Sequence, residues 1–377
     1  MSTLVINGNV VNPDCSGFKK ANILIENDTI TAIDDIDTAD TIIDAKGSFI
    51  LPGLVDIHNH GSIGIHYAED DSYEKALRFI ASKGVTSIFP TLGTNTMDAL
   101  ERGIKNALAV KASNPEGASI EGIHLEGPFI SSEKRGAMES PSPDCTLENF
   151  HRLIEAGQGN IKLMAIAPER ENALDVIREG VRLGVRMSLG HTNATYAEAM
   201  AGLEAGANHA THVFNAMRSY NHREPGVLGA VLTEPSVMCE TICDMVHLAL
   251  ATVKLVHKMK GLDGMILISD SVRITGMPDG EYEVGGYIRI VKDGVSHTPT
   301  GTIAGSCFTM ADGARRLIEL GFSLADIARV GALNPSRALG VDKEIGTLEV
   351  GKRADIIICD DKMNVEKVIL RGKEFIC

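Results

Sequence analysis

Histidines and carboxylates recur in this sequence just after short apolar runs, where strands are expected to end. His58 and His60 close the run LVDIHNHG, and Glu126 closes the run IHLEGPF. Because side chains alternate between the two faces of a strand, His58 and His60 are expected to point to the same side, with Asp56 behind them. Imidazoles placed in this way are suited to holding a divalent cation.

Four later runs end in the same kind of residue. They are VRMSLGHTNA with His191, NHATHVFNAM with His212, VMCETICDMVH with Asp244 and His247, and MILISDS with Asp270. Each residue alone could be an ordinary polar group at a strand end, and Asp270 or Glu126 could cap a turn. Their recurrence at so many strand ends favours one shared centre. Neutral imidazoles combined with carboxylates suit Zn²⁺ or Fe²⁺, with one or two ions per chain.

Such a centre predicts hydrolysis of an amide. Bound Zn²⁺ lowers the pKa of water from 15.7 to about 7 and can polarise a carbonyl group. An amine leaves only when its nitrogen receives a proton, so a carboxyl group must carry that proton. We expect Asp270 to take the proton from the attacking water and to pass it to the amine.

A second group of polar residues follows His212 in the run FNAMRSYNHREPG. Arg223 could offer its planar guanidinium to a phosphate, and successive backbone N–H groups near Asn215 and Ala216 could add further bonds. The alternative interpretation is a surface loop with ordinary charges, and the run by itself does not decide between the two.

The elements that must position these residues alternate between strand and helix. Helical runs such as 73–83, 173–183 and 310–320 lie between or after eight candidate strands, which start near Leu54, Val85, Ser119, Ile161, Val185, Asn208, Val237 and Met265. Eight strand–helix units predict an α/β fold, a (βα)₈ barrel whose active residues lie at the carboxyl ends of the strands. The Gly-rich segment 276–305 interrupts the eighth unit and is typical of a hairpin.

The two ends of the chain have a different texture. Residues 3–50 alternate in short apolar strands and turns, and ADIIICD and KVILRG repeat this texture near the end. Neither end alone could make more than a weak all-β fragment. We therefore predict one small β-sandwich domain, built from residues 1–53 together with 341–377, beside a barrel of residues 54–340.

Composition excludes several classes of partner. The 377 residues carry a net charge of −14, which repels a nucleic-acid backbone. No run approaches the roughly 18–20 apolar residues of a membrane helix, and no basic, apolar leader opens the chain. Seven scattered cysteines favour a reduced, cytoplasmic protein. Cys239 and Cys243 would lie about 13 Å apart along one strand and are expected in the core.

The motifs taken together resemble N-acetylglucosamine-6-phosphate deacetylases. The resemblance runs in order along nearly the whole chain, through HNHG (58–61), HLEGPF (124–129), GHTNA (190–194), THVFNAM (211–217), HREPG (222–226), ISDS (268–271), MPDGEYEVGG (277–286), IAGS (303–306), NPSRALG (334–340) and IGTLEVGKRAD (345–355). IGTLEVGKRAD marks only the wider amidohydrolase superfamily, whereas HREPG and PDGEY are more specific.

This resemblance implies a barrel with a terminal β-sandwich, usually as a homodimer, and an amino-sugar phosphate as substrate. The implied reaction is hydrolysis of N-acetylglucosamine 6-phosphate to glucosamine 6-phosphate and acetate. It also implies that Glu126, His191 and His212 hold the principal metal and that Asp270 is the proton shuttle. The implied substrate contacts are Ala137, Met138, Asn215, Ala216, Arg223, the stretch from Asp244 to His247, Ile303, Ala304 and Gly305.

Two features bear on the alternatives. Some members of the family lack the first-strand histidine pair and bind one metal, whereas this chain has His58 and His60, which predicts a second ion. Many members have a histidine where RGAME places Met138, which bears on the contacts to the sugar and on the choice of hexosamine. The alternative substrates are N-acetylgalactosamine 6-phosphate and an N-acyl amino acid. A noncatalytic barrel is a more remote alternative, because such proteins typically lose the metal ligands that this chain retains.

Overall fold

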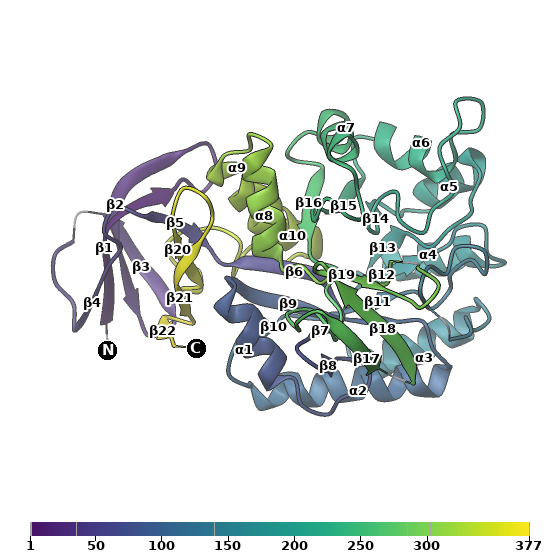
Figure 1. The fold of residues 1–377 in the computed structure, drawn as a ribbon, viewed down its shortest axis with the longest axis horizontal. Helices are drawn as coiled ribbons and strands as arrows, with labels where there is room; N and C mark the ends of the chain where they lie inside the picture. Colours follow the sequence, from purple (N-terminus) through teal and green to yellow (C-terminus); the bar gives the residue numbers. More distant parts are fainter. Residues whose placement is uncertain (1, 35, 139, 285, 302, 377) are drawn as a thin grey trace.

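The computed structural model describes residues 2–34, 36–138, 140–284, 286–301 and 303–376, and within them a parallel barrel forms the centre of the molecule (Figure 1). Its strands, in spatial order, are β6 (Leu54–Asn59), β9 (Val85–Gly93), β11 (Ile123–Glu126), β12 (Ile161–Ile166), β13 (Arg186–Leu189), β14 (His209–Ala210), β15 (Met238–Ile242) and β16 (Met265–Ile268). Every adjacent pair along this order is parallel.

The barrel closes where its first and last strands meet. The backbone N–H of Asp270 donates to the carbonyl of His58 at 3.0 Å, and the N–H of His60 donates to the carbonyl of Ser271 at 2.8 Å. This seam therefore joins residues that the sequence separates by more than half its length, and two of the candidate ligands lie directly on it.

The barrel strands are nearly continuous apolar runs, as expected for a parallel sheet buried on both faces. Leu54–Asn59 and Ile123–Glu126 are buried at every position. The candidate third strand near Ser119 is divided in two, since β10 (Ser119–Ile120) pairs only with β9 before β11 begins. Gly122 lies between the two pieces, and a Cβ atom at this position would lie only 2.5 Å from Lys162 Cγ.

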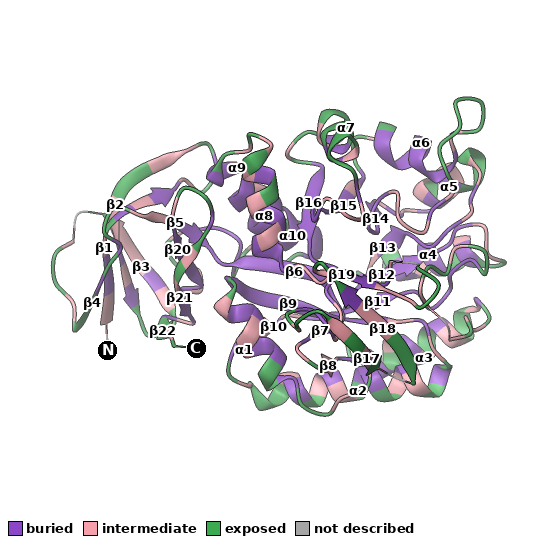
Figure 2. Ribbon diagram, viewed as in Figure 1, coloured by how far each residue is buried: buried purple, intermediate pink, exposed green. Residues whose placement is uncertain are grey.

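Helices surround the barrel with their apolar faces inward (Figure 2). Polar caps fix several helix starts, as at Thr195 and Thr309, where the side chain and the third helical residue form a reciprocal capping box. The helices are α1 (Glu74–Ser82), α2 (Met97–Ser113), α3 (Leu147–Gly157), α4 (Ala173–Arg182), α5 (Tyr196–Glu204), α6 (Gly226–Thr233), α7 (Leu250–Lys260), α8 (Met310–Glu319), α9 (Leu324–Ala328) and α10 (Asn334–Leu339), with a π-helical turn at Arg329–Leu333. In the described part of the chain, none is long and apolar enough to span a membrane.

Both ends of the chain contribute to one further sheet, at the left of Figure 1. From the N-terminal side come β1 (Ser2–Val11), β2 (Phe18–Glu26), β3 (Thr29–Asp34), β4 (Thr41–Asp44) and β5 (Phe49–Pro52), and from the C-terminal side β20 (Ile356–Cys359), β21 (Val365–Leu370) and β22 (Lys373–Phe375). The antiparallel pair β5–β20 joins the two groups. The sheet branches at β1, whose first half pairs with β4 and whose second half pairs with β5. The predicted fold class, a (βα)₈ barrel with a small β-sandwich domain built from both termini, is confirmed.

The predicted hairpin between the last barrel strand and α8 has three antiparallel strands. They are β17 (Gly280–Val284), β18 (Tyr287–Lys292) and β19 (Val295–His297), and β18 lies between the other two. A short ribbon, β7 (Gly61–Ser62) with β8 (Ile65–His66), follows the first barrel strand. Both structures begin at the carboxyl ends of barrel strands and so rise beside the mouth of the barrel.

Cys239 and Cys243 lie in the core, as expected. Cys239 is on β15 and Cys243 follows its end, and both are buried free thiols. Both contribute apolar volume to the core, and neither belongs to a candidate metal-binding group among the described residues.

Candidate active site

Three candidate residues share an unusual backbone position. His191, His212 and Asp270 each lie two residues beyond the last residue of their strand, at φ angles of 47°, 27° and 50°. A left-handed backbone is uncommon for residues other than glycine and costs about 1–3 kcal/mol each. The surrounding structure holds these turns, and each turn brings a polar side chain over the mouth of the barrel.

Glu126, the last residue of β11, is the meeting point of the imidazoles. Its Oε1 lies 2.8 Å from His212 Nε2 and 2.9 Å from His191 Nε2. The same oxygen lies 3.2 Å from His58 Nε2, and Oε2 lies 3.1 Å from His60 Nε2. Burial alone would raise the pKa of Glu126, but the imidazoles of His58 and His191 hold this pKa well below its usual value. The carboxylate is therefore charged inside the cluster.

Hydrogen bonds on the far side of two rings leave their Nε2 atoms directed at the centre. His191 Nδ1 lies 2.8 Å from the carbonyl oxygen of Lys134, which can only accept, so this nitrogen carries the proton. His58 Nδ1 lies 2.8 Å from a carboxylate oxygen of Glu240. Such partners select the tautomer whose Nε2 lone pair is available to a metal ion.

The donor set fits a divalent cation at two overlapping positions. Glu126, His191 and His212 form one group of three ligand atoms that lie within 4.8 Å of one another, and Glu126, His58 and His60 form another. Imidazole nitrogens and a carboxylate oxygen are the ligands of zinc and non-haem iron. Because Glu126 belongs to both groups, it could serve as a ligand at either position.

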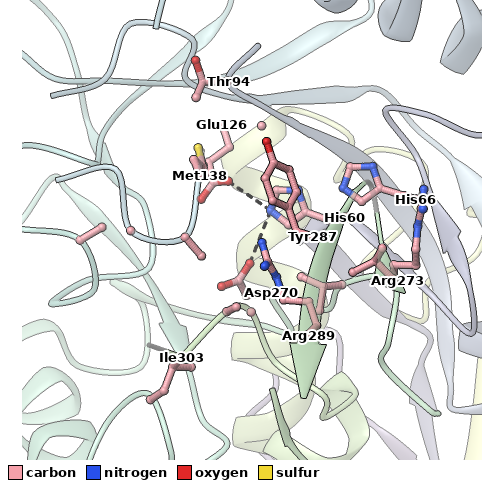
Figure 3. A pocket seen from close by; sticks show the side chains of 18 of the residues that line it. His60, His66, Thr94, Glu126, Met138, Asp270, Arg273, Tyr287, Arg289 and Ile303 are labelled. Atoms are coloured by element: carbon pink, nitrogen blue, oxygen red, sulfur yellow. Dashed lines mark ion pairs between the residues drawn. The ribbon is translucent and has the colours of Figure 1, made fainter. Parts of the chain in front are cut away.

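Asp270 lies on the opposite side of the histidine pair from Glu126. Its Oδ1 is 3.5 Å from both His58 Nε2 and His60 Nε2, and Figure 3 shows His60 between the two carboxylates. Burial alone would raise the pKa of Asp270, but His58 and His60 together lower this pKa below its usual value. A charged carboxylate at this position can accept a proton.

A cavity of about 620 Å³ opens above the cluster. Glu126, His191, His212, His60 and Asp270 lie in its wall, while His58 is fully buried behind them. Tyr287 and Arg289 of β18 reach the cavity from the three-stranded hairpin (Figure 3). The residues predicted from the resemblance that also line it are Ala137, Met138, Asn215, Ala216, His247, Ile303, Ala304 and Gly305.

His247 is held by its predicted neighbour Asp244. Its Nδ1 lies 2.7 Å from Asp244 Oδ2, and the backbone N–H groups of Val246 and His247 donate to the other oxygen. Burial alone would lower the pKa of His247, but the bond to Asp244 raises this pKa above its usual value. The cavity wall therefore carries an imidazole that favours its charged form.

Arg223 lies on the exposed loop before α6, outside the lining of the cavity. Its backbone N–H donates to the side chain of Asn221 at 2.9 Å. The arginines in the lining are Arg273, which forms ion pairs with Glu69 and Asp70, and Arg289. The structure thus brings all the predicted site residues to one centre and its cavity with the exception of Arg223.

Sequence reasoning missed a second layer of buried polar residues. Glu240 of β15, His209 of β14 and His124 of β11 are all fully buried behind the cluster. The sequence did contain one signal for this layer, because Glu240 is a charged residue inside the apolar run VMCETIC. Asp56, which the alternation placed behind the histidine pair, contacts Ser269, Asn59 and the backbone of His58, not an imidazole nitrogen.

Comparison with known proteins identifies the class. Residues 49–375 match the model of the amidohydrolase family, and the chain belongs to this family. It is 34% identical over 356 residues to the N-acetylglucosamine-6-phosphate deacetylase of Vibrio furnissii, covering 92% of this chain and 88% of that protein. It is 33% identical to the N-acetylgalactosamine-6-phosphate deacetylase of Escherichia coli O157:H7, covering 93% of each. The crystal structure of the N-acetylglucosamine-6-phosphate deacetylase from Pasteurella multocida superposes with a TM-score of 0.92 at 27% identity, covering 99% of each chain.

Proposed function

We propose that this protein hydrolyses N-acetylglucosamine 6-phosphate to glucosamine 6-phosphate and acetate. The observation that carries the proposal is the convergence of Glu126, four imidazoles and Asp270 on one point of the cavity wall. Relatives that match this chain over about nine-tenths of its length are deacetylases of N-acetylhexosamine 6-phosphates. The reaction is therefore the cleavage of a linear amide bond.

Glu126, His191 and His212 would hold the principal divalent cation, Zn²⁺ or Fe²⁺, with His58 and His60 adding a second ion beside Glu126. A cation held there would make water a stronger acid and polarise the acetyl carbonyl. The protein supplies the rest of the arrangement, because the hydrogen bonds of His191 to Lys134 and of His58 to Glu240 keep both rings aimed at the site.

Asp270 is the proposed acid and base. Its carboxylate takes a proton from the water as the water oxygen bonds to the carbonyl carbon, giving a tetrahedral intermediate. The resulting carboxylic acid then delivers this proton to the amide nitrogen as the C–N bond breaks, which leaves a neutral amine and acetic acid; the acid then ionises to acetate by losing its proton to solvent. The lowered pKa of Asp270 keeps the group in the form that the first step needs.

Substrate contacts are proposed for the residues that line the cavity. Backbone and side-chain groups at Ala137, Met138, Asn215, Ala216, Ile303, Ala304 and Gly305 would surround the sugar, as the resemblance implies. For the phosphate, His247 offers a charged imidazole in the wall, and Arg223 and Arg289 are the candidate guanidinium groups. Phosphate recognition by arginine favours planar, two-point contacts.

The second candidate substrate is N-acetylgalactosamine 6-phosphate. Two observations favour keeping it: Met138 lies in the cavity at a place where many family members have histidine, and one relative of similar identity acts on that sugar. An N-acyl amino acid is less favoured, since it offers no phosphate to the cationic side chains. A noncatalytic scaffold would have no use for the complete ligand set.

The proposal includes a cytoplasmic homodimer and the division of each chain into a barrel of residues 54–340 and a β domain of residues 1–53 with 341–377.

Turnover tests the function directly. The two N-acetylhexosamine 6-phosphates, unphosphorylated N-acetylglucosamine and an N-acetyl amino acid are assayed with protein of known metal content, and again after chelation. We expect N-acetylglucosamine 6-phosphate to give the highest kcat/KM. The protein should be inactive after chelation of its metal. Equal kcat/KM for phosphorylated and unphosphorylated sugar would contradict the proposal.

A further inference from the structure

Glu240 lies in the interior of β15, where its side chain is completely buried. It lies directly behind the histidine cluster, and neither the cavity nor solvent reaches it. Moving a carboxylate out of water costs several kcal/mol unless other groups replace the lost hydrogen bonds. A charged side chain at such a place therefore needs a complete set of partners.

Both oxygens of Glu240 have such partners. Oε2 accepts hydrogen bonds from His58 Nδ1 at 2.8 Å and from the backbone N–H of His212 at 3.1 Å. Oε1 lies 3.0 Å from His209 Nε2. One carboxylate thus connects β6 with the turn after β14, and it contacts two of the proposed metal-binding residues from behind. The bond to His212 also supports a residue whose φ of 27° is strained.

The bond to His58 decides how this ring faces the site. Because Glu240 only accepts hydrogen bonds, His58 must carry a proton on Nδ1, and Nε2 then faces Glu126 Oε1 at 3.2 Å. The opposite tautomer would direct an N–H at the place of the ion. His58 is fully buried, so water cannot replace Glu240 in selecting the tautomer.

The other buried carboxylate at this end of β6 acts differently. Asp56 is as fully buried as Glu240, but its oxygens accept from Ser269, the Asn59 side chain and the backbone N–H of His58. Asp56 therefore stabilises the backbone around β6 and does not orient an imidazole ring. The chain therefore offers a matched pair of buried carboxylates, of which only one contacts an imidazole nitrogen.

We propose that Glu240 is a positioning residue that fixes His58 as a ligand of a second divalent cation, bound with His60 and Glu126. The inference rests on the proposed metal-dependent function and extends it to a residue outside the cavity. Glu240 does not contact the substrate or the ion. It acts by selecting the tautomer and orientation of one ligand.

The test is a metal-binding measurement on the full chain. Wild-type protein, Glu240→Leu, which removes both acceptor oxygens, and the control Asp56→Asn are dialysed against buffered series of free Zn²⁺, and bound metal is measured per chain. Loss of a hydrogen-bonding partner behind a ligand typically weakens metal binding about 10–100-fold. We expect this loss for the second equivalent in Glu240→Leu, with a smaller change in the first equivalent, because Glu240 contacts His212 only through its backbone N–H. Asp56→Asn should bind both equivalents like wild type, even if its unfolding temperature falls.

A double substitution separates positioning from general damage. In a His58→Gln background, Glu240→Leu should cause no further loss of the second equivalent, because the ring that Glu240 orients is gone. If Glu240→Leu fails to fold, Glu240→Asp keeps the charge but withdraws the carboxylate by one methylene, and the same selective loss is expected. Circular dichroism verifies folding of each variant.

Three results would overturn the inference: a second equivalent bound by Glu240→Leu as tightly as by wild type, equal weakening of both equivalents, or a wild-type protein that never binds a second ion. Turnover of N-acetylglucosamine 6-phosphate by wild-type protein is measured in parallel. If wild-type protein turns over this substrate with only one bound ion, the proposed reaction is supported and the proposed role of Glu240 is wrong.

Discussion

The terminal β sheet and the mouth of the barrel both bury their side chains, but they bury opposite kinds. In the sheet, the fully buried residues are aliphatic, such as Ile23 of β2, Ile50 of β5 and Ile358 of β20. At the mouth the buried residues include imidazoles and carboxylates, and three of these, His191, His212 and Asp270, have a left-handed backbone. Aliphatic burial stabilises a fold by about 25 cal/mol per Å². Buried charge and strained backbone lower stability, so their presence at the mouth indicates that this region serves chemistry.

The largest expected effect at the mouth comes from Asp270→Asn. The amide keeps the shape of the side chain but cannot accept the proton of the water or deliver one to the leaving nitrogen. We expect kcat to fall about 10²–10⁴-fold, with metal content and unfolding temperature close to those of wild type. Steady-state kinetics and metal analysis check this. Near-normal turnover would remove Asp270 from the mechanism and would weaken the contrast between the two regions.

In the terminal sheet, by contrast, a substitution should lower stability and leave kcat unchanged. Ile50→Ala removes a fully buried side chain from β5 and leaves a cavity in an apolar core. We expect the free energy of unfolding to fall by about 2–5 kcal/mol, while kcat per folded molecule stays unchanged. Urea unfolding and kinetics below the transition measure the two quantities. A kcat that falls with stability would show that the sheet and the barrel mouth are coupled.

A more moderate effect should identify the guanidinium that reads the phosphate. Loss of a charge-assisted hydrogen bond costs roughly 1.5–3 kcal/mol, so the correct arginine-to-alanine variant should raise KM for the phosphorylated sugar about 10–150-fold. Arg223→Ala and Arg289→Ala are compared, and unphosphorylated N-acetylglucosamine is the control. The sequence predicts Arg223, and the cavity lining adds Arg289. Equal losses on both sugars would mean that the residue shapes the site instead.

The smallest expected effect concerns pH. Burial lowers the pKa of His247, but its bond to Asp244 and the charge of Asp270 raise this pKa above the ordinary value of 6.5. The imidazole therefore stays charged at neutral pH and loses its charge as the pH rises through the elevated pKa. From pH 7 upward, where the phosphate is already a dianion, KM for the phosphorylated sugar should rise about two- to tenfold. His247→Asn should flatten this dependence. A flat wild-type profile would exclude a charged His247 from phosphate binding.

The same contrast explains what the sequence could predict. The barrel strands and terminal strands follow from apolar runs of strand length, and His58, His60, His191, His212 and Asp270 follow from their positions at strand ends. Met138 and Ala137 were found only through a resemblance, because a loop residue has no periodic pattern. Glu240 was missed because only the folded barrel brings β15 behind β6. The placement of Arg223 depends on the course of an exposed loop, which no local pattern determines.

The seam between β6 and β16 has a consequence for how the protein acquires its activity. The proposed site combines His58 from the first barrel strand with Asp270, which follows the last, and their backbones bond to each other across that seam. During synthesis, His58 and His60 leave the ribosome long before Asp270 has been added to the chain. Contacts between such distant segments form slowly, because the intervening chain loses much conformational freedom when they close. A nascent chain that has not reached residue 270 has no complete centre, so the growing polypeptide remains inactive until its barrel has closed.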